Sequence, residues 1–311
     1  MKKNLPSFRN LFLISAMILG MLAPRGAEIF SPFLIYVLAF MMSLSLQQLS
    51  LTVFRPKPSI IRPILKGIFL NYFLFALISL PLVALFFSAK SMIFAGFVLI
   101  AISPPGVVII PMMARMNFNI NDAAIGTIGA YFFLILLFPS VMFFYGINAD
   151  VMEMFWLLFY SVIVPIVASR IIRRLPIKSF TFKYQGLMID ISFFILIYVV
   201  IGMNQSFLIN QYLDMIMPIL VLFIALFVFT LFYMAQMHKR RIGDDLVAGN
   251  TLLYSIKNNG FSAVSAFTLF GAEAAIPSAA LSVVLLVYII VFPWLFGKSK
   301  RIGVLMSTKS I

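Results

Sequence analysis

Long apolar segments separated by short polar ones run through the whole chain. Apolar stretches of 18 or more residues predict membrane-spanning helices. The run from Met215 to Met237 contains no charged residue, and neither does the run from Ala274 to Gly297. The same pattern predicts ten spans in all, at residues 9–24, 30–48, 65–88, 91–114, 122–146, 151–172, 186–204, 214–237, 247–271 and 276–297.

The polar segments between these spans are too short to hold a second domain. We therefore expect an all-α polytopic membrane protein in which residues 1–311 form a single transmembrane unit. The composition agrees, because 63% of the residues are hydrophobic and only 10% are charged. A signal peptide is the alternative for the first span, although Pro24-Arg25 makes a poor cleavage site and the symmetry described below favours a retained helix.

The net charge of +14 is explained by the membrane topology, because the basic residues are distributed as in a membrane protein and not as in a nucleic-acid-binding surface. If the N-terminus is cytoplasmic, twenty of the 23 lysines and arginines lie in cytoplasmic segments. Only Arg25 and Lys90 lie outside, and Lys257 lies within a span. This bias obeys the positive-inside rule and brings the basic residues to anionic lipid. It predicts cytoplasmic termini, a bacterial inner membrane, membrane lipid as a partner and no nucleic acid.

Ten spans divide into two halves of five, at residues 1–148 and 149–311. An odd number of spans inverts the second half relative to the first. Each half carries a helix-breaking sequence in its fourth span, Ser103-Pro104-Pro105-Gly106 in one and Lys257-Asn258-Asn259-Gly260 in the other. Interrupted helices at matching positions of two inverted halves point to the binding site of a secondary transporter.

Both interruptions have a physical cause in the residues. Pro104 and Pro105 each remove a backbone donor and clash with the preceding turn, whereas Asn258, Asn259 and Gly260 are poor helix formers. Backbone groups freed at membrane depth must be buried in protein or line a wet cavity. One break alone would favour a simple kink in a packed helix, but two matching breaks favour a substrate site.

Lys257 is the one basic residue well away from the ends of a span, where a charge costs at least about 2.5 kcal/mol. Such a residue usually marks a function. Other polar residues are expected near the two breaks, although each alone is more often a helix-packing contact. They are Asn71, Tyr72, Ser103, Thr127, Tyr131, Tyr254, Ser255, Ser262 and Ser265.

Enzymatic chemistry finds little support among the residue types. The chain has no cysteine, and its one histidine, His238, lies in a basic loop, so we expect no metal site and no cofactor. Asp190, near the cytoplasmic start of the seventh span, is the only acid inside a span rather than at its edge, and pairing with Arg173 or Lys183 is its simpler explanation. Gln47 and Gln48 end the second span, where we expect an interfacial role. No catalytic residue is therefore predicted.

Several short motifs together resemble the bile acid:sodium symporter superfamily of secondary transporters. Leu19–Pro24 ends the first span as in that family, and Met42–Leu46 is similar to its Met-Gly-Leu-X-Leu pattern. Gly96–Leu99 followed by Pro104-Pro105-Gly106 resembles its Pro-Gly-Gly break. Residues 257–260, followed by Ala274, Pro277, Ala279 and Ala280, resemble its Gln-Asn-Ser-Gly helix and the segment after it. The resemblance covers nearly the whole chain.

The resemblance implies a panel domain of spans one, two, six and seven. It also implies a core domain of the remaining six spans, in which the two broken helices cross. By the same resemblance, movement of one domain against the other would carry a small organic anion across the membrane by alternating access.

The departures from the family concern sodium. Val107–Ile110 stand where the family has a Thr-Ala-Ser-Asn pattern, and Leu253 and Lys257 stand where it has glutamate and glutamine. We therefore expect sodium-independent transport in which the ammonium of Lys257 replaces the bound cation. Coupling to protons, a static structural cation, a relocated sodium site, a channel and a transporter-derived sensor remain open as alternatives. The sequence does not identify the solute.

Overall fold

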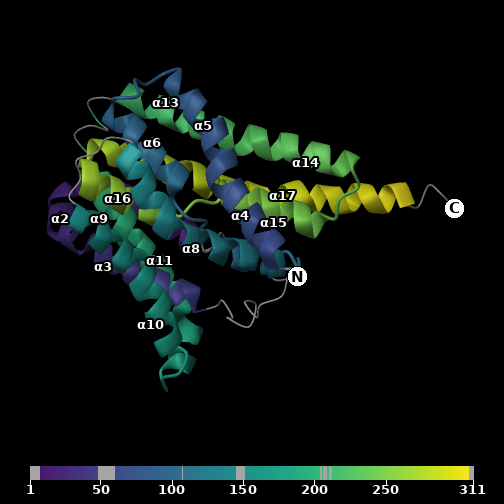
Figure 1. The fold of residues 1–311 in the computed structure, drawn as a ribbon, viewed down its shortest axis with the longest axis horizontal. Coiled ribbons are helices and arrows are strands. Elements are labelled where there is room, and N and C mark those ends of the chain that lie inside the picture. The colour runs from purple at the N-terminus through teal and green to yellow at the C-terminus, as the bar shows by residue number, and fades with distance from the viewer. Residues whose placement is uncertain are drawn as a thin grey trace.

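The computed structural model describes residues 8–47, 60–106, 108–144, 151–203, 205, 209 and 212–307. Helices make up almost all of this part of the chain, and it contains no strand (Figure 1). Six helices within it are long and apolar enough to cross a membrane, at residues 24–44, 61–84, 121–144, 178–203, 215–239 and 273–296. This is the architecture of an all-α integral membrane protein.

The first half of the chain contains four long helical stretches and two shorter helices. The first of them, α1, is followed by a bent stretch of three helices, and η4 is a π-helical turn inside the next stretch. The bounds are α1 (Phe8–Leu22), α2 (Pro24–Phe30), η1 (Ser31–Phe33), α3 (Leu34–Leu46), α4 (Ile61–Ile68), η4 (Phe69–Leu74), α5 (Phe75–Ala84), α6 (Met92–Ile102), α7 (Ile109–Arg115) and α8 (Asn121–Phe144).

The second half has a similar order of elements, with π-helical turns η5 and η6 inside two of its stretches. Its last helix extends beyond the rest of the bundle (Figure 1). The bounds are α9 (Val151–Leu158), η5 (Phe159–Ile163), α10 (Val164–Ile172), α11 (Lys178–Met203), α13 (Tyr212–Phe223), η6 (Ile224–Val228), α14 (Phe229–Lys239), α15 (Asp244–Ser255), α16 (Asn259–Phe270), η7 (Glu273–Ala275) and α17 (Ile276–Ser307).

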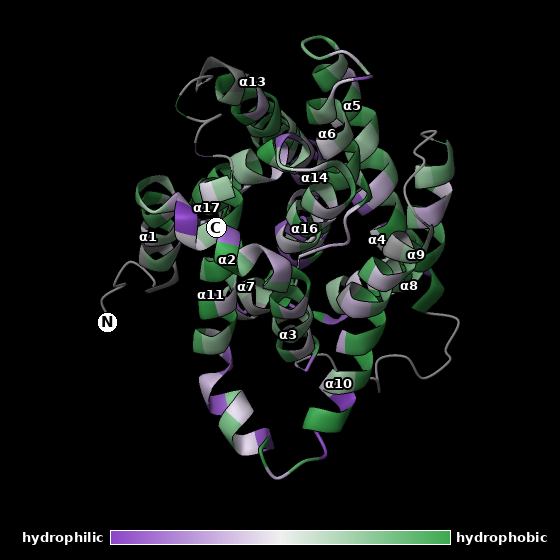
Figure 2. Ribbon diagram, turned by 90° about the vertical axis from the view of Figure 1, so that its left-hand side faces the viewer, coloured by the Kyte–Doolittle hydropathy of each residue, from purple (hydrophilic) through white to green (hydrophobic). Residues whose placement is uncertain are grey.

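The outer surface of the bundle is apolar. Large hydrophobic side chains such as Leu77, Phe143 and Trp294 are 70%, 80% and 73% exposed. Figure 2 shows hydrophobic colouring along most of each helix, with hydrophilic residues gathered around the turn between α10 and α11. Because exposed apolar area on this scale is unfavourable in water, these surfaces are suited to contact lipid.

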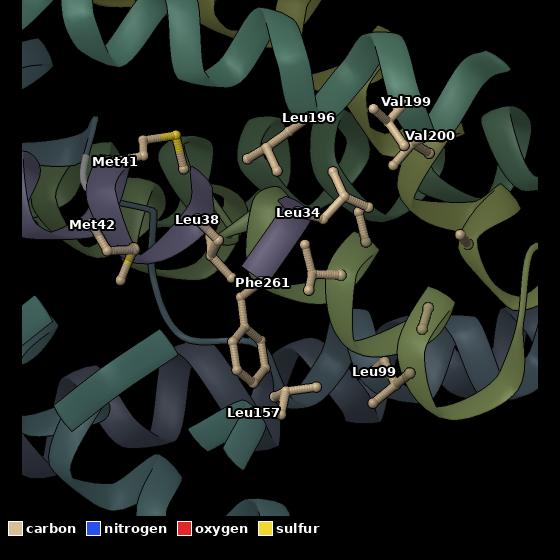
Figure 3. Close-up of a cluster of buried hydrophobic side chains, with 14 of the residues drawn as sticks. Leu34, Leu38, Met41, Met42, Leu99, Leu157, Leu196, Val199, Val200 and Phe261 are labelled. Atoms are coloured by element: carbon tan, nitrogen blue, oxygen red, sulfur yellow. The ribbon is translucent and has the colours of Figure 1, made fainter. Parts of the chain in front are cut away.

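The helices pack in two groups. In the first group, α11 lies against α1, α2 and α3, and α10 also packs against α3. In the second group, α4 packs against α8, α13 against α17, and α6 against α5, α16 and α17. The groups meet where Phe261 of α16 lies between Leu38 of α3 and Leu157 of α9 (Figure 3).

Candidate functional site

Helix is interrupted at the two places where the sequence predicts a break. After α6 ends at Ile102, Ser103 has an extended backbone, and α7 begins only at Ile109. After α15 ends at Ser255, Ile256 is extended, and α16 begins at Asn259. Each break therefore exposes several backbone groups that no helix satisfies.

The two broken segments satisfy each other. The amide of Gly106 donates to the carbonyl of Ile256 over 2.7 Å, and the amide of Asn258 donates to the carbonyl of Pro104 over 2.8 Å. Pro105 and Lys257 face each other in this antiparallel bridge. Pairing of this kind solves the problem that unbonded backbone groups create at membrane depth.

Gly106 allows the two segments to approach this closely. A Cβ atom at this position would lie 2.8 Å from the Cγ2 of Ile256 and 3.0 Å from the carbonyl oxygen of Lys257. Contacts this short would push the segments apart, so the close crossing requires a residue without a side chain.

The ammonium of Lys257 is buried beside this crossing. Its Nζ donates to the carbonyl of Asn71, to that of Ala101 over 2.9 Å and to that of Ser103 over 3.2 Å. The residue is 2% exposed. An ammonium has three N–H donors, so three carbonyl oxygens occupy all of them. No carboxylate among the described residues forms an ion pair with it.

Two further features stabilise the positive charge. Lys257 Nζ lies 4.5 Å from the centre of the Phe75 ring and 5.4 Å from that of the Tyr72 ring, within cation–π range. Ala101 and Ser103 are at the C-terminal end of α6, where the helix dipole is negative. Lys257 therefore acts as the cation that caps the broken helix α6.

Asn71 connects this cap to a third helical stretch. It lies in the π-helical turn η4, where the amide of Phe75 donates to the carbonyl of Tyr72. An α-helical amide at that position would donate to the carbonyl of Asn71 instead, and this is the carbonyl that Lys257 uses. The Asn71 side chain also donates to the carbonyl of Ser103 over 2.9 Å. π-Helical turns are frequent at functional sites.

Asn258 and Tyr131 hold the crossing through a second set of hydrogen bonds. The Oδ1 of Asn258 accepts from the amide of Phe261 and caps α16, while its Nδ2 donates to the hydroxyl of Tyr131 over 3.1 Å and to the Sδ of Met42. The Tyr131 hydroxyl in turn donates to the carbonyl of Pro105 over 3.1 Å. One phenol thus joins both broken segments.

We expect Tyr131→Phe to lower the free energy of unfolding by about 2 kcal/mol, because the Pro105 carbonyl and the Asn258 amide each lose a buried partner. The same change at Tyr36, which is 54% exposed, is the matched control and should be neutral. The measurement is the apparent melting temperature of the purified protein in detergent. Equal melting temperatures for both variants would contradict the bridging role of Tyr131.

Asn259 continues into a row of buried hydroxyl groups. Its Nδ2 donates to the Oγ of Ser282 over 2.6 Å, and Ser262 and Ser278 form the next bond of the row at 3.0 Å. This row joins α16 to α17.

Gly260 lies at the start of α16 against Leu38, Leu196 and Met41, where a larger residue would press on α3 and α11.

The side chains of the remaining predicted residues do not bond to the ammonium. Tyr254 donates to the carbonyl of Ala225, and Ser255 bonds to Thr230 and Tyr288, which indicates packing contacts. Thr127 and Ser265 are fully buried and their hydroxyls have no partner among the described residues. The hydroxyl of Ser103 stays within its own helix end, bonded to Ile100.

The polar residues that the sequence places away from the two breaks have the following positions. Gln47 is buried and donates to Thr181 of α11 over 2.9 Å, whereas Gln48 lies outside the described residues. Asp190 is partly buried on α11, and His238 is exposed near the end of α14. The described residues contain no group of metal-ligating side chains.

A small crevice of about 60 Å³ adjoins the crossing. The crossing contributes Gly106 and residues 256–259, α3 contributes Met41, α11 contributes Ile189 and Phe193, and α17 contributes Ser282 and Leu286. The crevice thus lies where the two groups of helices meet. A water molecule occupies about 30 Å³ of liquid, so the space admits at most a few atoms in this conformation.

Sequence reasoning missed several partners of the predicted residues. Ala101 and Phe75 contact the ammonium, and Met42 contacts Asn258. Phe75 follows Asn71 by four residues, a spacing that places both on one helix face. This spacing could have predicted that both residues reach the same site. The carbonyl of Ala101 could not be predicted as a ligand, because every residue has a backbone carbonyl.

No protein-family model matches the chain, and no curated protein sequence matches it significantly.

Proposed function

We propose that this chain is a secondary transporter that moves a small organic, anionic solute by alternating access without sodium. The observation that carries the proposal is the buried crossing of two interrupted helices, capped by the Lys257 ammonium. Discontinuous helices that meet inside the bilayer are the usual setting for transporter binding sites. The proposal also rests on the resemblance of the sequence motifs to the bile acid:sodium symporter superfamily.

The packing groups support a division into two moving parts. In the proposal, α1, α2, α3, α9, α10 and α11 form a panel domain, and the remaining helices form a core domain that contains both interruptions. Most helix contacts fall within one group or the other, and the meeting surface is largely made of aliphatic and aromatic side chains. Few polar bonds cross it among the described residues, and those of Asn258 and Tyr131 end on the Met42 sulfur, a weak acceptor. The proposed topology has ten spans in two inverted repeats, with both termini in the cytoplasm.

Lys257 takes the place of a bound sodium ion in this proposal. Three carbonyl oxygens converge on its ammonium, an arrangement of oxygen ligands that would also suit a small cation. A permanently attached cation would neutralise the end of α6 in every step of the cycle. The buried leucine at 253 agrees, because it supplies no oxygen where the family has a glutamate.

The chain contains no cysteine, so a single introduced cysteine can report access to the crevice. Leu286 lines the crevice, so Leu286→Cys is the reporter. Val287 is the next residue and lies on the exposed face of α17, so Val287→Cys is the control. In vesicles, we expect a membrane-impermeant maleimide to label position 286 from either side, at equal rates in sodium and in choline, and to leave position 287 unlabelled. Labelling at 286 requires the crevice to open.

Each outcome of this experiment separates the alternatives. Labelling of residue 286 from one side only would contradict alternating access, and opening that strictly requires sodium would contradict the replacement by Lys257. Steady single-channel currents across planar bilayers would identify a channel instead. Saturable uptake of cholate, a steroid carboxylate, by the same vesicles would support the proposed class of solute.

A further inference from the structure

A second, larger cavity lies away from the crossing. It has a volume of about 330 Å³ and is lined by residues of α4, α7, α8 and α15. It lies near the residues at which α4, α8 and α15 begin, and it shares no lining residue with the crevice beside Lys257. Its volume is within the range of small-molecule sites.

Four charged side chains line this cavity with opposite signs. Arg62 and Lys66 lie four residues apart on α4, whereas Asp122 and Asp245 lie in the first turns of α8 and α15. The lining is therefore formally neutral. Asp122 interacts electrostatically with Lys66, and Asp245 accepts one backbone amide, but none of the four forms a direct ion pair with another described residue. Each therefore keeps hydrogen-bonding capacity for a ligand.

Asn250 supplies a buried polar group to the same cavity. It is 4% exposed and its Nδ2 donates to the hydroxyl of Tyr233 over 2.8 Å. That bond orients the amide, and the Oδ1 accepts no hydrogen bond from the described residues. The amide of Asn119 donates to Asp245 Oδ2 over 3.3 Å. Asn250 and Asp245 are thus held as acceptors, of which Asn250 is buried.

Each charge has an ordinary explanation when taken alone. Aspartates favour the first turn of a helix, and basic residues favour the ends of membrane spans. Neither rule explains why two cations and two carboxylates surround one cavity with no direct ion pair among these described residues. A ligand with a single charge would leave two like charges facing each other, whereas a ligand with one charge of each sign would match both pairs.

The rest of the lining is apolar. Pro63, Met113, Ala123 and Leu253 contribute to it, beside Gly249. From this arrangement we propose that the cavity binds a zwitterionic solute of the α-amino-acid type with an apolar side chain. Its carboxylate would lie on Arg62 and Lys66, its ammonium would lie among Asp122, Asp245 and Asn250, and its side chain would contact Met113 and Leu253.

Three matched probes test this assignment by isothermal titration calorimetry on the whole protein in nanodiscs. Leucine carries both charges, 4-methylpentanoate carries only the carboxylate, and isopentylamine carries only the ammonium. We expect saturable binding of leucine, and binding of each single-charge analogue that is about tenfold or more weaker, because a charged hydrogen-bonding group is lost.

Variants then assign the binding to the cavity. Arg62→Gln and Asp245→Asn should each weaken leucine binding about tenfold or more, and Arg174→Gln, an exposed basic residue outside the cavity, should leave it unchanged. No saturable binding of leucine up to about 10 mM, equal binding of 4-methylpentanoate, or equal binding by both charge variants would overturn the proposal. The assay measures binding without transport, so its result does not depend on the proposed transport function.

Discussion

Lys257→Met is expected to lower the free energy of unfolding by about 3–5 kcal/mol, because the buried carbonyls of Asn71 and Ala101 lose their long-range donor and that of Ser103 keeps only the Asn71 side chain. Methionine has a similar length and fills the space, so the change isolates the ammonium. The carbonyls of Asn71, Ala101 and Ser103 cannot turn to solvent, since all three residues are buried. The end of α6 also loses its compensating charge.

The apparent melting temperature in detergent measures this effect, and we expect a fall on the order of 10 °C. Lys257→Gln is the graded control, because its amide keeps two donors and should lose less stability. A melting temperature of Lys257→Met equal to that of the wild type would show that the ammonium does not hold the crossing together.

The same position tests whether the ammonium stands in for sodium. Lys257→Ala removes the side chain and leaves its three carbonyl oxygens around a space in which a cation would fit. We expect sodium chloride, compared with choline chloride at equal ionic strength, to raise the melting temperature of this variant and not that of the wild type. Sodium stabilisation of the wild type would mean that the chain keeps a sodium site elsewhere.

Gly67→Val is expected to lower the free energy of unfolding by about 3 kcal/mol, because it forces apart two helices whose backbones touch. A Cβ atom at Gly67 would lie 2.6 Å from the Cα and the carbonyl oxygen of Gly126 on α8. Membrane helices associate closely through small residues of this kind. Tyr72, on the same stretch as Gly67, donates to the carbonyl of Ala130 over 2.8 Å, so separation would also disturb the surroundings of Lys257.

Gly186→Val is the matched control for this prediction. Gly186 also lies inside a helix, α11, and a Cβ atom there would meet nothing within 4 Å. The same substitution should therefore change the unfolding free energy by no more than about 0.5 kcal/mol. If both variants melt at the same temperature, the contact between α4 and α8 does not set the stability of the bundle.

Much of the helical architecture could be predicted from local patterns. Uninterrupted apolar runs such as 215–237 predict helices of membrane length, because hydropathy and length act within one segment. The interruptions were also predictable, since Pro104 and Pro105 prevent regular helix hydrogen bonding wherever they occur. Lys257 was recognisable as unusual because a charge among apolar neighbours is costly in any fold.

The partners of these residues were not predictable in the same way. The ammonium bonds to Asn71, 186 positions away, and to Ala101, 156 positions away. Tyr131 joins Pro105 to Asn258 from a third helix. Such contacts depend on how several helices pack, and backbone carbonyls give no sign in the sequence that they will serve as acceptors.

The sequence by itself therefore determined where helices form, where two of them break and which charge is out of place. Those properties follow from short-range sterics and from the cost of exposing polar groups to lipid. Only the tertiary structure decided that the two breaks pair with each other, that the charge of Lys257 lies on the end of α6, and that Arg62 and Asp245 line one cavity. These outcomes depend on long-range packing, which brings together groups that no local pattern relates.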